Sequence, residues 1–345
     1  MFFLPITLIF IGHAIVFLIY TLKNHKQKRQ KKIFTNELIV SMLFFAAGLL
    51  FPFMYQSHNP TLDPNILNFL WLTSSIFIII EEILWFFVIF YVFIVCKKNP
   101  SLKIEKNHEN FKKYFTQNWN YDFRKDIERK IIHIIPIGVI FIIWTIGNIL
   151  NVFGVLTQWN IDVYSYCYWI IITIGFGFVL MVAIADILKL NKTYLLPNWA
   201  VRWYRKSMIA DELETYVSST PLVLCFVPFI FAPFPIFASV ALITTVSDAT
   251  ASLIGKKYGK HKIFEQSNKT IEGFIAGFTS TFLIVVLITI IYHSFMPVNL
   301  GTILIMATVA AFLFLIIDIF SKHISDNILN PILIGLGMWI IFVLI

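Results

Sequence analysis

Long apolar runs recur along the whole chain, and short polar segments separate them. Most runs are about 17 to 25 residues long, which allows a helix to cross a hydrocarbon layer roughly 30 Å thick. None alternates apolar and polar residues as a strand of a membrane barrel does. We therefore predict an all-α, polytopic integral membrane protein with about ten transmembrane helices. The predicted segments are residues 2–22, 38–55, 66–96, 131–156, 164–188, 217–231, 236–254, 271–296, 302–320 and 328–345.

The positions of the 27 Lys and Arg residues indicate how these segments are oriented. All of them fall in alternate connections, whereas the connections at 56–65, 157–163, 233–235 and 297–301 contain none. Since cytoplasmic loops carry the excess of Lys and Arg, this pattern predicts that both termini face the outer side. The turn at 233–235 is decisive, because its loss would merge two segments and reverse the orientation of everything after it.

Composition supports the membrane class and narrows the partners. Of the 345 residues, 58% are hydrophobic and only 13% are charged, against roughly 25% charged in a soluble domain. The net charge of +8 lies in loops beside anionic headgroups, so we expect a lipid bilayer as partner and no nucleic acid. Cys96, Cys167 and Cys225 lie in or beside apolar runs without CxxC spacing, which is typical of small core residues. The bias toward Ile, Phe, Lys and Asn favours a microbial cell membrane over the endoplasmic reticulum.

The most informative stretch is 244–273, in which an apolar segment contains a carboxylate, Asp248. An ionisable group inside a membrane segment costs on the order of 3 kcal/mol, so it indicates a functional site. Ser247, Ala251, Gly255 and Gly259 fall four apart, and on a helix they form one small-residue face that a second backbone can approach closely.

Cations follow this segment, and a second carboxylate, Glu272, comes after them. Carboxylates next to a cationic loop fit a phosphate and a divalent metal. Three other polar clusters are predicted at cytoplasmic ends of segments, and we expect them to join the same site. The cations of the loop are Lys256, Lys257, Lys260, Lys262 and Lys269; the other clusters are Arg129, Lys130 and His133; Asp186 and Lys189 with Arg202, Arg205, Lys206 and Glu212; and Asp318, Lys322, Asp326 and Asn327.

RKIIHI, DILKL, SDATASLIGKKYG with NKTIEG, and SDNILNP follow one another along the chain. These four motifs resemble those of the CTP-dependent lipid kinases, the family of dolichol kinase, phytol kinase and CTP-dependent diacylglycerol kinase. SDATASLIGKKYG followed by NKTIEG is similar to the family's GDxxAS, GxxxG and KKTxEG; RKIIHI, DILKL and SDNILNP resemble its RKxxH, EILRL and DDNLxxP. The resemblance covers residues 126–345, which it marks as a catalytic membrane domain, and leaves 1–125 as an N-terminal three-helix region of unknown role. The chain departs from the family's residue types at Ser247, Asn268, Asp186 and Ser325.

The resemblance implies transfer of the γ-phosphoryl group of CTP, with Mg²⁺, to the hydroxyl of a long-chain isoprenoid alcohol such as a polyprenol. Asp248 is then a metal ligand or base, with Asp326 as second metal ligand and Glu272 as a further catalytic carboxylate. The residues expected at the nucleotide and its phosphates are Lys256, Lys257, Lys269, Thr270, Gly255, Gly259, Ser252, Arg129 and Lys130; further polar candidates are His133, Asp186, Lys189 and Asn327.

Other interpretations stay open. Diacylglycerol and phytol kinases present the same motifs, and phosphatidate cytidylyltransferases share GKHK and KTxEGF, although nothing after Gly273 resembles their second signature. A non-catalytic protein or a transporter is the alternative of another class. Single residues also have simpler interpretations. Lys256 to Lys262 fit cations that anchor a cytoplasmic loop, and Asp248 fits a structural hydrogen bond between helices. Asp318 and Lys322 are spaced as a simple ion pair on one helix. Glu81 and Glu82, in the middle of the third segment, fit none of these schemes.

Overall fold

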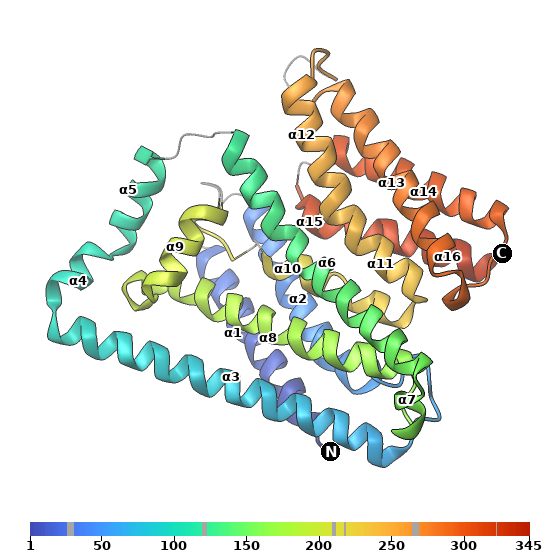
Figure 1. The fold of residues 1–345 in the computed structure, drawn as a ribbon. Coiled ribbons are helices and arrows are strands. Elements are labelled where there is room, and N and C mark those ends of the chain that lie inside the picture. Colours follow the sequence, from blue (N-terminus) through green and yellow to red (C-terminus); the bar gives the residue numbers. More distant parts are fainter. Residues whose placement is uncertain (26–30, 119–122, 209–211, 217–218, 264–268, 322) are drawn as a thin grey trace. The chain divides into compact units, whose positions relative to one another are not determined.

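The computed structural model is all-helical in the part of the chain that it describes, which is residues 1–345 without 26–30, 119–122, 209–211, 217–218, 264–268 and 322 (Figure 1). Within those residues one isolated β-bridge, between Lys262 and Thr270, is the other regular pairing. The predicted all-α class is confirmed. The chain divides into two compact units, which are Met1–Ile132 with Phe141–Leu224, and His133–Ile140 with Cys225–Ile345.

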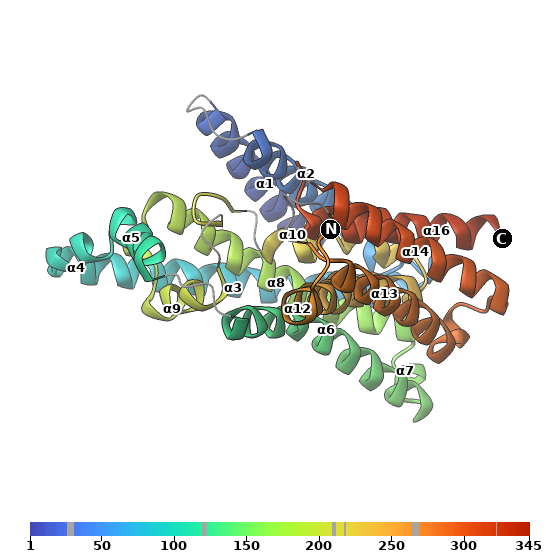
Figure 2. The same cartoon turned by 90° about the horizontal axis from the view of Figure 1, so that it is seen from above.

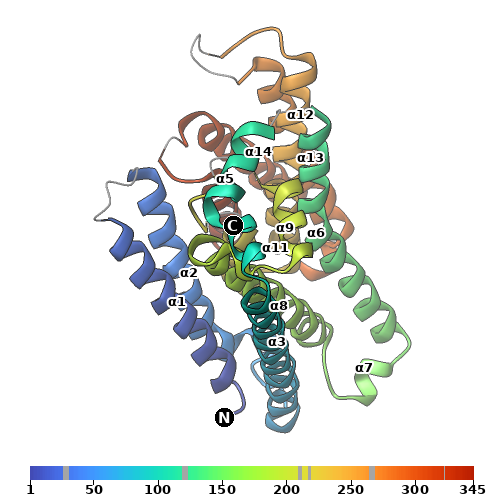
Figure 3. The same ribbon diagram turned by 90° about the vertical axis from the view of Figure 1, so that its left-hand side faces the viewer.

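The first unit contains the N-terminal helices. In Figure 3, α1 and α2 lie side by side, and α3 packs on α8. Phe10, Phe44, Phe51 and Phe176 are fully or almost fully buried between these helices and contact one another through their rings. The elements are α1 (Leu4–His25), α2 (Lys31–Met54), α3 (Pro64–Lys98), α4 (Pro100–Glu105), α5 (His108–Asn118), most of α6 (Phe123–Val152), α7 (Val155–Gln158), α8 (Val163–Asn191), η1 (Thr193–Leu195), α9 (Asn198–Ser207) and α10 (Ser219–Leu224).

Side-chain caps define where the long helices of this unit begin. Asp63 accepts a hydrogen bond from the backbone N–H of Asn65 at the start of α3, and Pro64 occupies the first turn, where its missing N–H is not needed. Asp162 caps α8 in the same way through the N–H of Ser165. These caps lie in connections that contain no cation, which the sequence analysis placed on the outer side.

The second unit is a bundle of long helices, two of which contain a π-helical segment. The rod α11–η4–α12 packs on α13, α13 packs on α14, and α14 lies beside α16 (Figures 1 and 2). The elements are η3 (Val227–Phe231), α11 (Phe234–Leu242), η4 (Ile243–Ser247), α12 (Asp248–Tyr258), α13 (Ile271–Ile291), η5 (His293–Phe295), α14 (Leu300–Phe320), α15 (Asp326–Leu329), η6 (Asn330–Ile334) and α16 (Gly335–Leu344).

Nine helices in the described residues are long and apolar enough to cross a membrane, and they correspond to nine of the ten predicted segments. The protein is therefore an integral membrane protein by length and composition. All three cysteines are buried free thiols, as expected of core residues. The orientation of the helices stays a prediction.

The predicted segment at 217–231 is the exception, and this prediction is corrected. It forms the six-residue helix α10 and the five-residue 3₁₀ helix η3. At rises of about 1.5 and 2.0 Å per residue the two span only about 19 Å as helices. Pro228 explains the break, because proline has no N–H to donate to a helix and disfavours the α conformation in the residue before it.

The turn before α11 separates these elements as predicted. Pro233 precedes the first residue of α11, and η3 ends at Phe231. The division between a region of unknown role and a catalytic domain at residue 125 stays a prediction; the compact units divide the chain within α6 and after Leu224.

Candidate functional site

Asp248 is placed by an irregularity in its helix. The π-helical segment η4 ends at Ser247, and Asp248 is the first residue of α12. Thr244 and Thr245 within η4 donate their hydroxyl protons to the carbonyls of Val240 and Ala241, at 2.7 and 2.9 Å. Such back-bonding bends helices, and π-segments are frequent at functional sites. The position of Asp248 thus depends on the local register of η4.

The small-residue face predicted on this helix is confirmed. A Cβ added at Gly273 of α13 would lie 2.6 Å from the carbonyl oxygen of Ala251 and 3.0 Å from the Cα of Gly255. A Cβ added at Gly277 would lie 3.0 Å from the Cβ of Ala251. Because these distances leave no room for a side chain, α12 and α13 approach each other backbone to backbone.

Asp326 lies beside the second π-helical segment. It is the first residue of α15, one turn before η6, and its Oδ1 accepts the N–H of Asn327 at 2.9 Å. The segments η4 and η6 contact each other within the second unit. The two carboxylates predicted as metal ligands therefore belong to helices that meet at their π-segments.

Two buried polar atoms lie in these segments without a partner. The hydroxyl of Ser247 and the Oδ1 of Asn330 make no hydrogen bond in the described part of the chain, although Ser247 is fully buried and Asn330 is 3% exposed. Buried polar groups are almost always paired, so an unpaired one requires an explanation, such as an ion or water bound there. The sequence analysis did not identify Asn330 as a candidate site residue. It could have been found as a polar amide within an apolar segment, directly before Pro331.

Glu272 and Thr270 hold the connection between α12 and α13. The Glu272 carboxylate accepts the N–H groups of Lys260 and His261 at 3.1 and 3.3 Å and lies 2.8 Å from Nδ1 of His261. Thr270 caps α13 by accepting the N–H of Gly273 at 3.3 Å. Both side chains predicted for catalysis or phosphate contact thus position the cationic loop.

The loop lysines have two kinds of surroundings. Lys256 and Lys257 are exposed at the end of α12, and Lys257 lies over the ring of Tyr258 at 5.1 Å. Lys269 instead donates to the carboxylate and the backbone carbonyl of Asp318 on α14. The predicted pair of Asp318 with Lys322 stays a prediction, because Lys322, like Asn268, lies outside the described residues.

Asp186 and Lys189 form an enclosed ion pair in the first unit. Both side chains are fully buried, and Nζ of Lys189 lies 3.0 Å from Oδ1 of Asp186. Lys189 also donates to the carbonyls of Glu212 and Thr215 at 3.1 and 2.8 Å. Tyr204 donates its hydroxyl to Asp186 at 2.9 Å, and burial beside that carboxylate raises the pKa of Tyr204 well above its ordinary value. The pair joins α8 to α9 and to the segment at 212–215.

The lysine and arginine candidates of α6 and α9 also lie in the first unit. Arg129 approaches Asp126 one turn earlier on α6, at 3.3 Å, and Lys130 is buried. His133 follows Arg129 by four residues on the same continuous helix, as predicted. Arg202 and Arg205 line a polar pocket of about 340 Å³ between α9 and the α4–α5 connection. Arg129, Arg202 and Arg205 are not in the unit that contains Asp248, whereas His133 is.

The second unit contains donors that suit Mg²⁺. No group of three or more His, Cys, Asp or Glu side chains in the described residues is arranged to hold a metal. Mg²⁺ in phosphoryl-transfer enzymes is commonly bound by one or two carboxylates together with substrate phosphates. Asp248 and Asp326 offer carboxylate oxygens, and Ser247 and Asn330 add unpaired oxygens from the two π-segments that contact each other. All four are oxygen donors and fit that need.

Comparison of the chain with protein-family models, with curated proteins and with solved structures finds no match.

Proposed function

We propose that this protein transfers the γ-phosphoryl group of CTP to the hydroxyl of a long-chain isoprenoid alcohol. The observation that carries the proposal is the contact between η4 and η6, two π-segments that each adjoin a carboxylate and contain an unpaired buried oxygen. The sequence resemblance to CTP-dependent lipid kinases supports the same reaction, since Asp248 and Asp326 belong to two of its motifs.

In this proposal Asp248 and Asp326 hold Mg²⁺, which neutralises charge on the triphosphate. Phosphoryl transfer passes through a loose transition state, so the protein's main task is to position the reactants and stabilise charge. Lys256 and Lys257 lie at the exposed end of α12 and can contact phosphates, because a Lys side chain is a flexible point charge. Glu272 and Thr270 fix the loop from which these contacts are made.

Both proposed substrates can reach a site at the cytoplasmic face of the membrane. The charged end of α12 belongs to a connection that the positive-inside pattern assigns to the cytoplasm, where CTP is soluble. A lipid hydroxyl reaches the same plane from the bilayer. We further propose that the protein acts in a microbial cell membrane.

The test uses the full-length protein in lipid nanodiscs with γ-labelled CTP and Mg²⁺. A polyprenol, diacylglycerol and phosphatidic acid are offered separately. We expect label on the polyprenol, its loss in Asp248→Asn by at least about 100-fold, and its loss when Mg²⁺ is chelated.

Asp63→Asn is the matched control, because Asn also caps a helix well and Asp63 lies at the start of α3 in the other unit. It should keep wild-type activity. Label on diacylglycerol alone would assign a different lipid, and activity of Asp248→Asn equal to wild type would refute the assigned metal ligand.

A further inference from the structure

Two carboxylates in the middle of α3 are not used by the proposed reaction. Glu81 and Glu82 lie within a long apolar helix of the first unit. Oε2 of Glu81 and Oε1 of Glu82 are buried, and neither has a hydrogen-bond partner in the described residues. Ionisable side chains at such positions are rare and mark binding sites or proton pathways.

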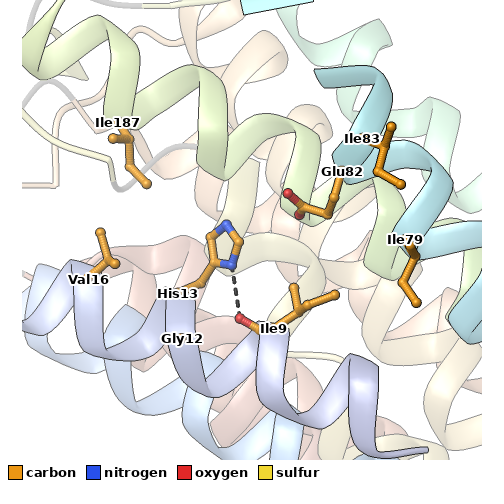
Figure 4. Close-up of a pocket in the computed structure, with 8 residues that line it drawn as sticks. All are labelled: Ile9, Gly12, His13, Val16, Ile79, Glu82, Ile83 and Ile187. Carbon is orange, nitrogen blue, oxygen red and sulfur yellow. Dashed lines mark hydrogen bonds between the residues drawn. The ribbon is translucent and has the colours of Figure 1, made fainter. Parts of the chain in front are cut away.

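The two carboxylates point in different directions. Glu81 lies against α8, where a Cβ added at Gly177 would be 2.4 Å from its Oε2. Gly177 therefore leaves the space that this carboxylate fills. Glu82 instead reaches toward α1, and its carboxylate faces the ring of His13 across a pocket (Figure 4).

This pocket has the size and character of a small-ligand site. Its volume is about 480 Å³, within the range of roughly 300 to 1,000 Å³ usual for such sites. Its walls are apolar and come from three helices, with Ile9 and Val16 on α1, Ile79 and Ile83 on α3, and Ile187 on α8. Glu82 and His13 are its polar lining residues.

The hydrogen bond of His13 defines what its ring offers to a ligand. Nδ1 lies 3.0 Å from the carbonyl oxygen of Ile9. Because a carbonyl oxygen only accepts hydrogen bonds, Nδ1 carries the proton of this bond. In the neutral ring Nε2 is then an acceptor. Nε2 has no partner in the described part of the chain, and Figure 4 shows it turned away from that hydrogen bond.

We propose that this pocket binds the hydroxyl end of a long-chain alcohol that enters from the bilayer. A hydroxyl both donates and accepts, so it pairs with Nε2 of His13 and with the carboxyl group of Glu82 at once. In this arrangement the hydroxyl donates to Nε2 of His13 and accepts from the protonated carboxyl group of Glu82. A plain hydrocarbon leaves both groups unpaired, and a phosphate brings a charge into a pocket whose described lining contains no Lys or Arg. The inference does not depend on phosphoryl transfer, because binding requires neither CTP nor the second unit's carboxylates.

The experiment is photo-crosslinking in nanodiscs without nucleotide. The probe is a hexadecanol that carries a diazirine in its chain. We expect crosslinked peptides from α1 and α3, and we expect competition by hexadecanol at least about tenfold stronger than by hexadecane or by hexadecyl phosphate. Equal competition by hexadecane would overturn the proposal, since the pocket would then be an unspecific apolar groove.

Two kinds of variant test the assignment. Glu82→Leu and His13→Leu should each weaken competition by hexadecanol about tenfold, whereas Glu81→Gln should leave it unchanged. Gly12→Leu should abolish crosslinking in α1 and α3 by filling the pocket, because a Cβ at Gly12 meets nothing within 4 Å and the fold tolerates it.

Gly138→Leu is its control, since a Cβ there also meets open space and Gly138 lies outside the pocket. Unchanged crosslinking in Gly12→Leu, with an unchanged melting temperature, would refute the site even if the Glu82 variant failed to fold.

Discussion

At the scale of single residues, charged side chains of this protein differ mainly in how completely they are partnered. Lys189 is fully enclosed, with a carboxylate and two carbonyls as acceptors and no exposure to water. The spacing of Asp186 and Lys189, three apart on a helix, is equally typical of an exposed pair, so their burial was not predictable. It depends on α9 and the segment at 212–215, which cover them.

Removing one charge of this pair should destabilise the first unit. Lys189→Met leaves Asp186 buried without its counter-charge, and we expect a loss of about 3 to 5 kcal/mol in unfolding free energy. The double variant Lys189→Met with Asp186→Leu should recover part of that loss, because no isolated charge remains. Thermal unfolding in detergent measures both. A single variant as stable as wild type would contradict the enclosed pair.

At the scale of elements, the sequence predicted that a second backbone approaches α12 closely. It predicted neither that this backbone is α13 nor the π-segments beside the contact. The contact follows from residue size and helical spacing alone, as Ala251, Gly255 and Gly273 demonstrate. A π-turn forms when a backbone N–H bonds to the carbonyl five residues earlier instead of four. In η4 this depends on tertiary packing and on the hydrogen bonds of the threonine hydroxyls. The unpaired Asn330 could be identified only once η6 was placed against η4.

Gly273→Ala should disrupt the packing of these two helices. The added methyl group would lie 2.6 Å from the carbonyl of Ala251, and overpacking of this kind costs about 1 to 3 kcal/mol. Gly138→Ala, where a Cβ meets nothing within 4 Å, should be neutral or slightly stabilising. Melting temperatures of the two variants measure the difference, and equal values would argue against the close approach.

Asn330→Leu separates stability from activity at the π-segments. Because Oδ1 of Asn330 is buried and unpaired, an apolar side chain of similar size should leave stability unchanged or raise it by up to about 1 kcal/mol. If Asn330 serves the metal or phosphate site, Mg²⁺-dependent label transfer should fall at least about tenfold. A large loss of stability would instead show that Asn330 has a structural partner.

At the scale of the whole molecule, hydropathy predicted nine of the membrane helices because their length and apolar content are sufficient signals. It failed for residues 217–231, where apolar composition belongs to a short buried segment that contains Pro221 and Pro228. The predicted assembly of distant polar clusters into one site stays a prediction. Arg129, Asp186 and Lys189 belong to a different unit from Asp248.

The predicted orientation is testable with engineered cysteines, because the native thiols are buried. Lys257→Cys at the exposed end of α12 should react with a membrane-impermeant maleimide only in opened vesicles. Gln158→Cys, at the exposed end of α7, should react in intact cells. The reverse pattern would invert the topology. Labelling on opposite sides requires residues 217–231 to cross the membrane in addition to α8 and the rod α11–η4–α12. Labelling of both positions on the same side would show that residues 217–231 do not cross.

The central claim is that the second unit transfers the terminal phosphoryl group of CTP to a lipid alcohol. The most direct measurement incubates the protein in nanodiscs with Mg²⁺, with either a polyprenol or phosphatidic acid, and with CTP labelled at either the α- or the γ-phosphorus. The account predicts that γ-label enters the lipid, that α-label stays in CDP, and that Asp248→Asn abolishes the transfer. Incorporation of α-label into phosphatidic acid with release of pyrophosphate would contradict the account and assign a cytidylyltransferase.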